Sequence, residues 1–413
     1  MATPATVADG YDEASVAGAS AARDEPDWLR ERRAEAARAF AAMPNPSPAS
    51  RLWKYTDVTA FDFALFPPAS AAISLSGDVP EGSSEYPGAV TTLRAAVEQW
   101  PDVPRSDVGK LVPSTEGKFV AANAALWDEG VYIHVPRGVT CDSPIIVDID
   151  ATALPEAAIF PRVLVLAGEQ AEVTIVLRLR SGETPLLVSG VIELYAHDSS
   201  RVRLLTDERW GGQTQDFTTV RSLLGRDADA RIATIALGGQ LIKQTVEARL
   251  AGEGANSVIH GIALGDLDQQ FDFVTLQDHE GPRTTSDVAI KAALAGASRN
   301  IYYGITRVEE SAKGAEANQE NRNLLLSANS KADSDPVLEI LTSDVIRCGH
   351  AAAVGPVDQE ALFYLQARGL DYRAALKLLV QGFFQSVAGV MGLPELEEEL
   401  AEAVTAKLAT AEL

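Results

Sequence analysis

The sequence predicts a mainly β fold, with a parallel β-helix as its core and helical regions on both sides of that core. From Gly130 onwards, short β-branched segments with alternating apolar residues follow one another for about 220 residues, separated by Gly, Asp, Ser and Pro. No helical pattern interrupts them, and the region is too long for one ordinary β-sandwich. A stack of similar coils accounts for both observations.

A short turn-like motif recurs within this region, and we interpret it as the corner of a coil. It occurs as AGEQAEV from Ala167, AHDSSRV from Ala196, GRDADARI from Gly225, AGEGANSV from Ala251, AGASRNI from Ala295 and SANSKAD from Ser327. The spacings are 29, 29, 26, 44 and 32 residues, as expected of a solenoid whose coils carry insertions. The alternative is a run of unrelated hairpins whose turns share a composition.

The composition predicts four segments along the chain. Residues 1–25, rich in Ala, Ser, Thr and acids, are expected to form a mobile N-terminal tail. Residues 26–125 should form a helical region, beginning with an amphipathic helix over 27–43 that Asp27 caps and PNPSPAS ends. Residues 126–355 should form the β-helix core, and residues 356–413 a C-terminal helical domain.

Three helices are expected in the C-terminal domain, the first two capped by Asp358 and Asp371 and the third opened by Pro394. The middle helix has a broad apolar face that includes Leu376, Leu379, Phe383 and Phe384. A face this apolar must bury itself, either against neighbouring elements or against a partner protein. These four residues are therefore the candidates for partner binding.

Charge and cysteine content restrict the classes of partner and compartment. The net charge of −23 argues against nucleic acid and against an anionic membrane surface, because the electrostatic interaction would be repulsive. No run of about 18 apolar residues and no signal-like segment occurs, so no membrane span is expected. Two cysteines, Cys141 and Cys348, give no disulfide framework, which favours a reducing cytoplasm.

Common enzyme motifs are absent from the sequence. There is no G-x-x-x-x-G-K-[S/T] loop, no G-x-G-x-x-G after a strand, no H-E-x-x-H and no C-x-x-C. The chain is therefore expected to bind no nucleotide itself and not to act as an enzyme. Structural or surface roles are expected for the scattered histidines His134, His197, His260 and His279.

Cys348 and His350 are the candidates for a chemical site, because they lie two positions apart in SDVIRCGHAAAVG, residues 343–355. On an extended strand, side chains at i and i+2 point to the same face. Thiolate and imidazole are both good ligands for iron and zinc, but two ligands do not fill the coordination shell of a metal. Other ligands would come from elsewhere in the fold or from a partner chain. The alternative is a packed thiol beside a neutral histidine.

Residues 321–370 resemble the hallmark of the SufB/SufD (SufBD) family of iron–sulfur cluster assembly proteins, through NRNLLLS, PVLEI, DVIRCGHAAAVG and LFYLQARG. Upstream, QQFDFVTLQDHEGPRTTSD and AALAGASRNIYYGI resemble the central segment of the family. RLWKYTDV resembles the W-K-Y-T of SufD, and SufD is the more similar type, because SufB has an E-H-E run whose last Glu would fall at Ala351. The chain departs from the commoner C-S-H-G-A-T-V-G at Gly349, Ala351 and Ala353, which keeps both ligand types.

The resemblance implies a right-handed parallel β-helix and a non-catalytic scaffold for cluster assembly. It implies pairing with SufB through the β-helices, a SufC ATPase bound through the C-terminal helices, and sulfur delivered on the SufB side by a cysteine desulfurase system. Iron or a nascent Fe-S cluster would lie at the SufB interface, held partly by His350 and Cys348. A homodimer of the isolated chain is also open. Two alternatives stay open: a structural partner-binding subunit without metal ligands, and a β-helix carbohydrate-active enzyme.

Overall fold

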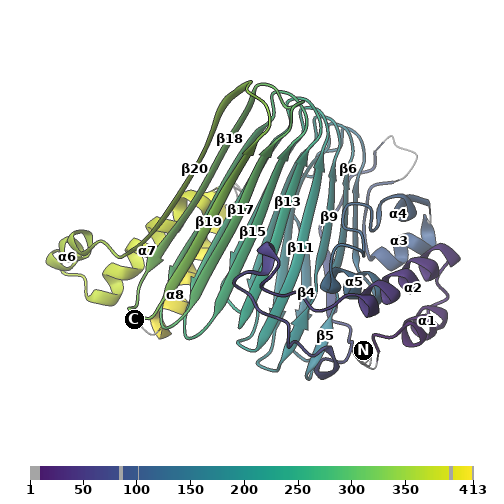
Figure 1. Cartoon of the computed structure of the whole chain (residues 1–413), viewed down its shortest axis with the longest axis horizontal. Coiled ribbons are helices and arrows are strands. Elements are labelled where there is room, and N and C mark those ends of the chain that lie inside the picture. The colour runs from purple at the N-terminus through teal and green to yellow at the C-terminus, as the bar shows by residue number, and fades with distance from the viewer. Residues whose placement is uncertain (1–9, 83–86, 101, 390–393, 412–413) are drawn as a thin grey trace.

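A parallel β-solenoid of about 8 turns forms the centre of the molecule, with helices toward both ends of the chain (Figure 1). The computed structural model describes residues 10–82, 87–100, 102–389 and 394–411. Strands account for 42% of the chain and helices for 24%. The parallel β-helix core with helical flanks that the sequence predicts is confirmed.

Two sheets make up the solenoid within the described residues. The nine-stranded sheet runs β1 (Ala72–Ser76), β4 (Ile145–Ala151), β7 (Glu172–Ser181), β10 (Arg201–Arg209), β12 (Asp229–Ala236), β14 (Asn256–Gly265), β16 (Thr285–Leu294), β18 (Ala315–Leu325), β20 (Val345–Pro356). The eleven-stranded sheet runs β19 (Lys331–Ile340), β17 (Arg299–Val308), β15 (Gln270–His279), β13 (Leu241–Leu250), β11 (Thr214–Leu224), β9 (Val191–Ala196), β6 (Arg162–Ala167), β3 (Val131–Val135), β2 (Ala89–Thr91), with β8 (Leu186–Val188) pairing with β11 and with β5 (Ala157–Ile159). Neighbouring strands are parallel, except that β1 and β2 pair antiparallel with β4 and β3.

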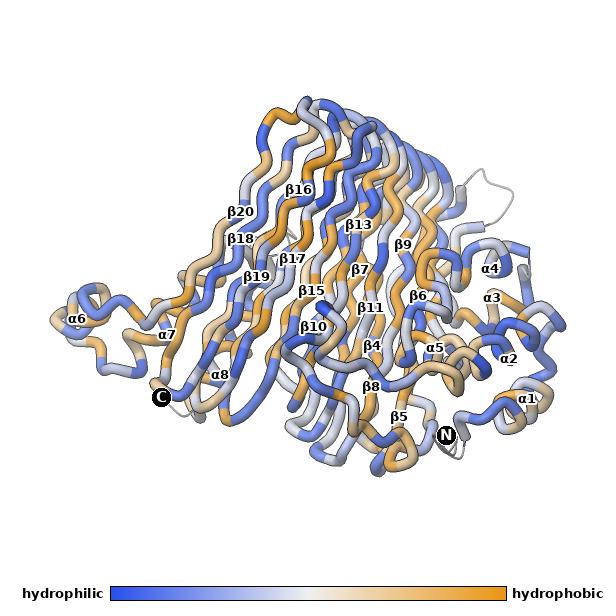
Figure 2. The backbone as a smooth tube through the Cα atoms, in the orientation of Figure 1, coloured by the Kyte–Doolittle hydropathy of each residue, from blue (hydrophilic) through white to orange (hydrophobic). Residues whose placement is uncertain are grey.

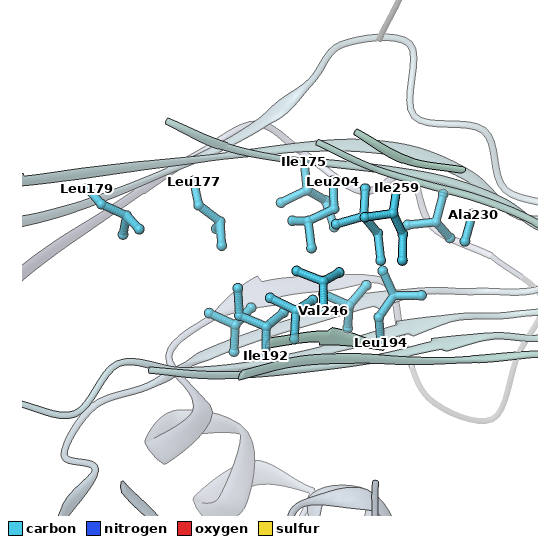
Figure 3. Packing of buried hydrophobic residues seen from close by; sticks show 14 of the residues in the cluster. Ile175, Leu177, Leu179, Ile192, Leu194, Leu204, Ala230, Val246 and Ile259 are labelled. Atoms are coloured by element: carbon cyan, nitrogen blue, oxygen red, sulfur yellow. The ribbon is translucent and has the colours of Figure 1, made fainter. Parts of the chain in front are cut away.

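The two sheets face each other across an interior that we call the lumen. Apolar residues alternate with polar ones along the strands, as the hydropathy colouring in Figure 2 shows, and one set points inward. Leu177 and Leu204 of the nine-stranded sheet face Ile192 and Val246 of the eleven-stranded sheet (Figure 3). Inward apolar residues from successive coils therefore join in one core, as expected of a solenoid.

The corners between strands repeat one backbone conformation. In seven successive coils a residue with positive φ occupies the same corner: Gly138 (φ 70), Gln170 (60), Ser199 (59), Asp227 (54), Gly254 (72), Arg283 (55) and Gly314 (73). These positions are 27 to 32 residues apart. The amide of each donates to a carbonyl in the next coil, for example Gln170 N to Asp198 O at 2.9 Å and Gly314 N to Asp344 O at 2.7 Å. This column of hydrogen bonds continues the sheets around the bend.

The predicted corner motif belongs to two different corners. Its first four occurrences lie in the column described above, whereas those from Ala295 and Ser327 lie at the opposite corner, where Gly296 has a φ of 57°. The column also includes Arg283 in EGPRTT, whose composition differs from that of the motif. The apparent spacing of 44 residues has this origin, and the coils themselves are nearly regular.

N-terminal helices cover the outer face of the eleven-stranded sheet at the start of the solenoid. They are α1 (Glu13–Ala22), α2 (Asp27–Ala42), α3 (Leu93–Gln99), α4 (Asp102–Asp107) and α5 (Lys118–Leu126), with two 3-10 turns, η1 (Arg51–Trp53) and η2 (Phe63–Leu65). Their apolar side chains share one cluster with outward residues of the sheet, among them Leu164 and Phe217. The predicted helix over 27–43 is present, but Pro26 is its N-cap and Asp27 its first residue.

The predicted mobile tail over 1–25 is wrong for the part that the structure describes, and residues 1–9 lie outside the described residues. Helix α1 begins after Asp12, whose carboxylate accepts from Ser15 N at 2.9 Å and caps the helix. Tyr11 and Val16 are buried. Tyr11 Oη donates to Phe66 O at 2.8 Å. Long-range packing therefore orders a segment whose own composition gives little helical periodicity.

The helices that follow the solenoid are α6 (Gln359–Ala367), α7 (Tyr372–Ala388) and α8 (Pro394–Thr410). Helix α7 packs against the outer face of the nine-stranded sheet at β14 and β16, whereas α6 contacts α7 and projects away from the strands (Figure 1). Asp358 caps α6, and Asp371 accepts from Ala374 N at 2.8 Å at the start of α7, as the sequence predicts. Lys407 of α8 donates to Leu237 O at 2.6 Å and so ties α8 to the sheet. Within the described residues, no helix is long and apolar enough to cross a membrane.

Candidate functional site

The last strand of the nine-stranded sheet, β20, carries both candidate ligands. In its register with β18, Cys348 lies beside Ala317 and His350 lies beside Gln319. Ala317 and Gln319 are wholly buried and belong to the inward set of β18. Because side chains in register on adjacent parallel strands share a face, Cys348 and His350 lie on the lumen face of the last coil.

The two candidate ligands differ in environment. Cys348 is half-buried and packs with Val345 against the apolar cluster of Val308, Ala312 and Ala315. Burial raises the pKa of the Cys348 thiol above its ordinary value, and a hydrogen bond with the Ala317 backbone partly opposes that rise. The thiol is therefore protonated at neutral pH, and binding a metal would release its proton. The His350 side chain is exposed.

The end of the solenoid that carries β20 is open. In the part of the chain that the structure describes, no strand pairs with the outer edges of β19 and β20, which end their two sheets. Apolar side chains are exposed there, with Ile346 at 73% and Leu341 and Val354 at nearly half. An unprotected sheet edge beside exposed apolar residues is typical of an interface with another chain.

Within the described residues, the two candidate ligands do not make a complete metal site. Across residues 10–82, 87–100, 102–389 and 394–411, no group of three or more His, Cys, Asp and Glu side chains is placed to hold a metal ion. Cys348 and His350 supply at most two donors. A four-coordinate iron or zinc would therefore take its remaining ligands from another chain or from its cargo.

Polar side chains fill the lumen beneath the open end. Asn321 Nδ2 donates to Ile290 O at 3.0 Å, and Asn323 Nδ2 donates to Asn321 Oδ1 at 2.7 Å. Asn300 Nδ2 donates to Asn323 Oδ1 at 2.7 Å. Gln319, Tyr302 and Thr275 continue this polar layer. The first two asparagines are those of the NRNLLLS motif, so that motif builds the floor of the candidate site.

Comparisons with known proteins identify the family of this chain. The family model described as "SUF system FeS cluster assembly, SufBD core domain" matches residues 149–383, more than half of the chain. The chain belongs to the SufBD family. An iron–sulfur cluster assembly SufBD family protein of Mycobacterium tuberculosis is 30% identical over 298 residues, which cover 70% of this chain and 74% of the relative. A SufBD family protein of Staphylococcus epidermidis is 26% identical over 418 residues, covering 91% and 88%.

The RLWKYT segment of this SufBD protein is an anchor on the solenoid wall. Lys243 Nζ lies 2.7 Å from Asp272 Oδ2 and donates to Leu52 O at 2.7 Å. The ammonium group lies 4.7 Å from the centre of the Trp53 ring, and Thr56 Oγ1 donates to the Asp272 carboxylate. Burial lowers the pKa of Lys243, and Asp272 opposes that shift. The motif therefore fastens the N-terminal segment across β13 and β15.

The four candidates for partner binding on α7 lie mostly inside the protein. Leu376 and Phe384 are buried in a cluster with outward residues of the nine-stranded sheet, such as Ile262. Leu379 and Phe383 are partly buried against the same cluster. Leu376 and Phe384 are therefore not on the surface that a partner would meet, because both side chains pack within the chain.

Other apolar and aromatic side chains of α6 and α7 are exposed to solvent. Phe363 is 71% exposed, and Tyr364, Tyr372 and Leu378 are also exposed. We call these four residues the α6–α7 patch. In α6 only Leu362 is buried, and Phe363 and Tyr364 follow it directly. The sequence indicated these exposed residues through the aromatic pair that directly follows Leu362. Three consecutive side chains on one helix turn point in different directions, so they cannot all be buried on one face.

Proposed function

We propose that this SufBD protein is a SufD-type subunit, a scaffold on which iron or a nascent iron–sulfur cluster is held between two chains. The observation that carries the proposal is the open last coil, where Cys348 and His350 share the lumen face of β20 in an incomplete site. A site completed by a second chain needs donors at an uncovered end, and this end provides them.

The assignment to the SufD type rests on sequence details at the site and at the anchor. The chain has a C-x-H arrangement at Cys348 and His350, and Ala351 stands where SufB-type chains have the last Glu of an E-H-E run. The RLWKYT anchor adds a second SufD-like feature. The carboxylate that a SufB-type chain carries would then come from the partner, which makes the two chains complementary.

The partner at the open end is proposed to be a SufB-type chain. The edges of β19 and β20 present backbone N–H and C=O groups that another β-helix can pair with. The exposed Ile346 and Val354 add apolar area to this edge. Two copies of this chain can pair through the same edge, so a homodimer in isolation is an expected competing state.

A SufC-type ATPase is the proposed partner of the C-terminal helices, at the α6–α7 patch. Helix α7 packs directly on the nine-stranded sheet through Leu376 and Phe384. A pull on these helices by nucleotide-driven dimerisation of the ATPase would therefore reach the sheet that ends in β20. The nucleotide would be bound by that partner and not by this chain, and sulfur would arrive on the SufB side from a cysteine desulfurase system in the cytoplasm.

The chain itself carries out no covalent step in this proposal. His350 offers a ring nitrogen, which is free to bind when the imidazole is neutral, and Cys348 offers a thiol that loses its proton on binding. The role of both is to hold iron in place until the partner ligands and sulfide complete the shell. A subunit that binds its partners without any metal ligand is the competing function, and the same experiment separates the two.

The test is reconstitution of the purified complex. The chain is combined with SufB-type and SufC-type subunits, isolated by size exclusion, and supplied anaerobically with Fe²⁺, cysteine and a desulfurase. We expect His350→Ala to reduce bound iron and cluster absorbance at least about tenfold, since even residues that only support a ligand change affinity by about 10–100-fold. Cys348→Ala should reduce them as well.

His134→Ala is the matched control, because this histidine lies on β3 at the other end of the solenoid, hydrogen-bonded to Pro87 O at 2.9 Å. It should leave cluster assembly unchanged. If His350→Ala and Cys348→Ala both assembled cluster as wild type does, the ligand proposal would be lost and the purely structural subunit supported. Failure of the wild-type chain to bind either subunit would overturn the proposed partners.

A further inference from the structure

A buried glutamine lies next to His350 in the lumen and has a free acceptor. Gln319 of β18 is in register with His350 of β20, so the two residues are separated by one strand spacing of about 4.8 Å. Gln319 is wholly buried, and its Oε1 has no hydrogen-bond partner among the described residues. A buried carbonyl oxygen without a partner is rare and calls for a specific explanation.

The orientation of this amide is fixed from across the lumen. Gln319 Nε2 donates to Tyr302 Oη at 2.6 Å, and Tyr302 Oη is 3.0 Å from Thr275 Oγ1. Tyr302 lies on β17 and Thr275 on β15, so the chain of contacts crosses from one sheet to the other. Because Nε2 is engaged by the phenol, Oε1 is the end of the amide that is left to accept.

Gly304 provides the space for this arrangement. A Cβ atom at Gly304 would collide with Gln319 Nε2 and with Tyr302 Oη. The lumen therefore holds the glutamine and the tyrosine only because this position on β17 has no side chain. Residues of β15, β17 and β18 together fix the position of the Gln319 amide. The missing partner of its oxygen is therefore not an accident of a loosely held side chain.

The other two lumen amides on β18, Asn321 and Asn323, already have hydrogen-bond partners. Asn321 donates to Ile290 O and accepts from Asn323 Nδ2 and from Ser334 Oγ. Of the amides on β18 that line the floor of the site, Gln319 is the one in register with His350 and the one whose oxygen is unpartnered among the described residues.

We propose that Gln319 is a positioning residue for His350. When the exposed His350 side chain turns toward the lumen, Gln319 Oε1 accepts one imidazole N–H, which selects one tautomer and leaves the lone pair of the other ring nitrogen for the partner chain. Histidines that bind metals generally donate their second N–H to a carbonyl or carboxylate in this way. The metal role rests on the proposed function, whereas the hydrogen bond itself does not.

The test measures the tautomer of His350 in the metal-free, full-length chain. The chain has 5 histidines, so ¹⁵N-histidine labelling gives few ring signals, and His350→Ala assigns the relevant one. Spectra are recorded at about pH 8.5, and the ring nitrogen shifts of a neutral imidazole report its tautomer. Wild type should show one dominant tautomer, and Gln319→Met, which keeps the size but removes the acceptor, should show a mixture.

Two further variants keep the test decisive if Gln319→Met fails to fold. A control variant shows whether the effect depends on the position of the glutamine beside His350 or on losing any buried glutamine. Gln319→Glu keeps an acceptor and should keep the dominant tautomer, and Tyr302→Phe should loosen it. Gln277→Met is the control, because Gln277 is also wholly buried in the lumen with an unpartnered amide but is in register with Thr306. It should leave the His350 tautomer unchanged.

The outcomes separate this inference from the proposed function. An unchanged tautomer in folded Gln319→Met, or an equal shift in Gln277→Met, overturns the inference even if His350→Ala abolishes cluster assembly. A shifted tautomer supports the hydrogen bond even if His350→Ala assembles cluster normally, in which case the proposed function is what fails. If both hold, Fe²⁺ affinity of the complex should fall about 10–100-fold in Gln319→Met.

Discussion

Glu193→Gln is expected to lower the free energy of unfolding by about 3–5 kcal/mol, because it removes one charge of a buried ion pair and leaves the other unpaired. Glu193 of β9 and Arg162 of β6 are almost completely buried, and Arg162 Nη2 lies 2.6 Å from Glu193 Oε2. The carboxylate also accepts from the backbone N–H of Gly109, Leu111 and Val112 at 2.8, 3.0 and 3.1 Å. It therefore joins the segment after α4 to the solenoid.

Glu172→Gln is the matched control for this prediction. Glu172 also pairs with an arginine at 2.6 Å, Arg201, but the two side chains are 39% and 63% exposed. An exposed pair contributes about 0–1 kcal/mol, so this variant should unfold almost as wild type does. The measurement is the urea dependence of tryptophan fluorescence for both variants. Equal destabilisation by the two substitutions would show that burial does not determine how much the Arg162–Glu193 pair contributes to the free energy of unfolding.

Acidification is expected to weaken the fold through His279, which lies in the lumen with Nδ1 2.8 Å from Thr284 Oγ1 and Nε2 2.8 Å from Ser286 Oγ. Burial lowers the pKa of His279 to about 4. The unfolded chain, with an ordinary pKa of about 6.5, therefore takes up a proton first as the pH falls. The contribution of neutral His279 to the free energy of unfolding is fully present above about pH 6.5. It is lost as the pH falls from 6.5 to about 4, by up to about 3 kcal/mol.

His279→Gln removes the titrating group and keeps a side chain that can hydrogen-bond. It should flatten the pH dependence of unfolding between pH 6.5 and 4, even if it lowers stability at pH 7. His197→Gln, at an exposed corner histidine, should leave the pH dependence as in wild type. The measurement is the urea midpoint across this pH range. If the urea midpoint of His279→Gln depended on pH as that of wild type does, the acid sensitivity would arise from other groups.

The solenoid could be predicted from sequence because its local chemistry repeats. Alternating strands and corner residues tolerant of positive φ are local properties, and Gln170, Ser199 and Asp227 all lie in recurring corner motifs. The column also contains Arg283, whose neighbours differ in composition, so a motif search passes over it. Backbone conformation repeats more faithfully than the residues that adopt it.

The errors arose where tertiary packing decides the structure. Tyr11 and Val16 order the segment around α1 by contacts with distant elements, which local periodicity does not encode. The apolar face of α7 was predicted, but periodicity cannot say whether Leu376 meets its own sheet or a partner. The polar lumen was missed, because an inward-facing Gln319 has the same place in the sequence pattern as an outward-facing polar residue.

The sequence nominated Cys348 and His350 as candidate ligands, but it did not predict their setting. The two-residue spacing placed Cys348 and His350 on one face, and the register with β18 agrees with that expectation. The open end, the half-buried thiol and the asparagine floor follow from the position of β20 as the last strand of its sheet, which only the assembled solenoid reveals.

In the proposed function, the open last coil is a half-site that a SufB-type chain covers. The test is hydrogen–deuterium exchange of residues 331–356, measured with and without that chain. We predict that amides of β20 exchange more slowly in the complex, because their free edge becomes paired, while β7 in the middle of the solenoid exchanges as before. A stable complex in which exchange of 345–356 is unchanged would contradict the claim.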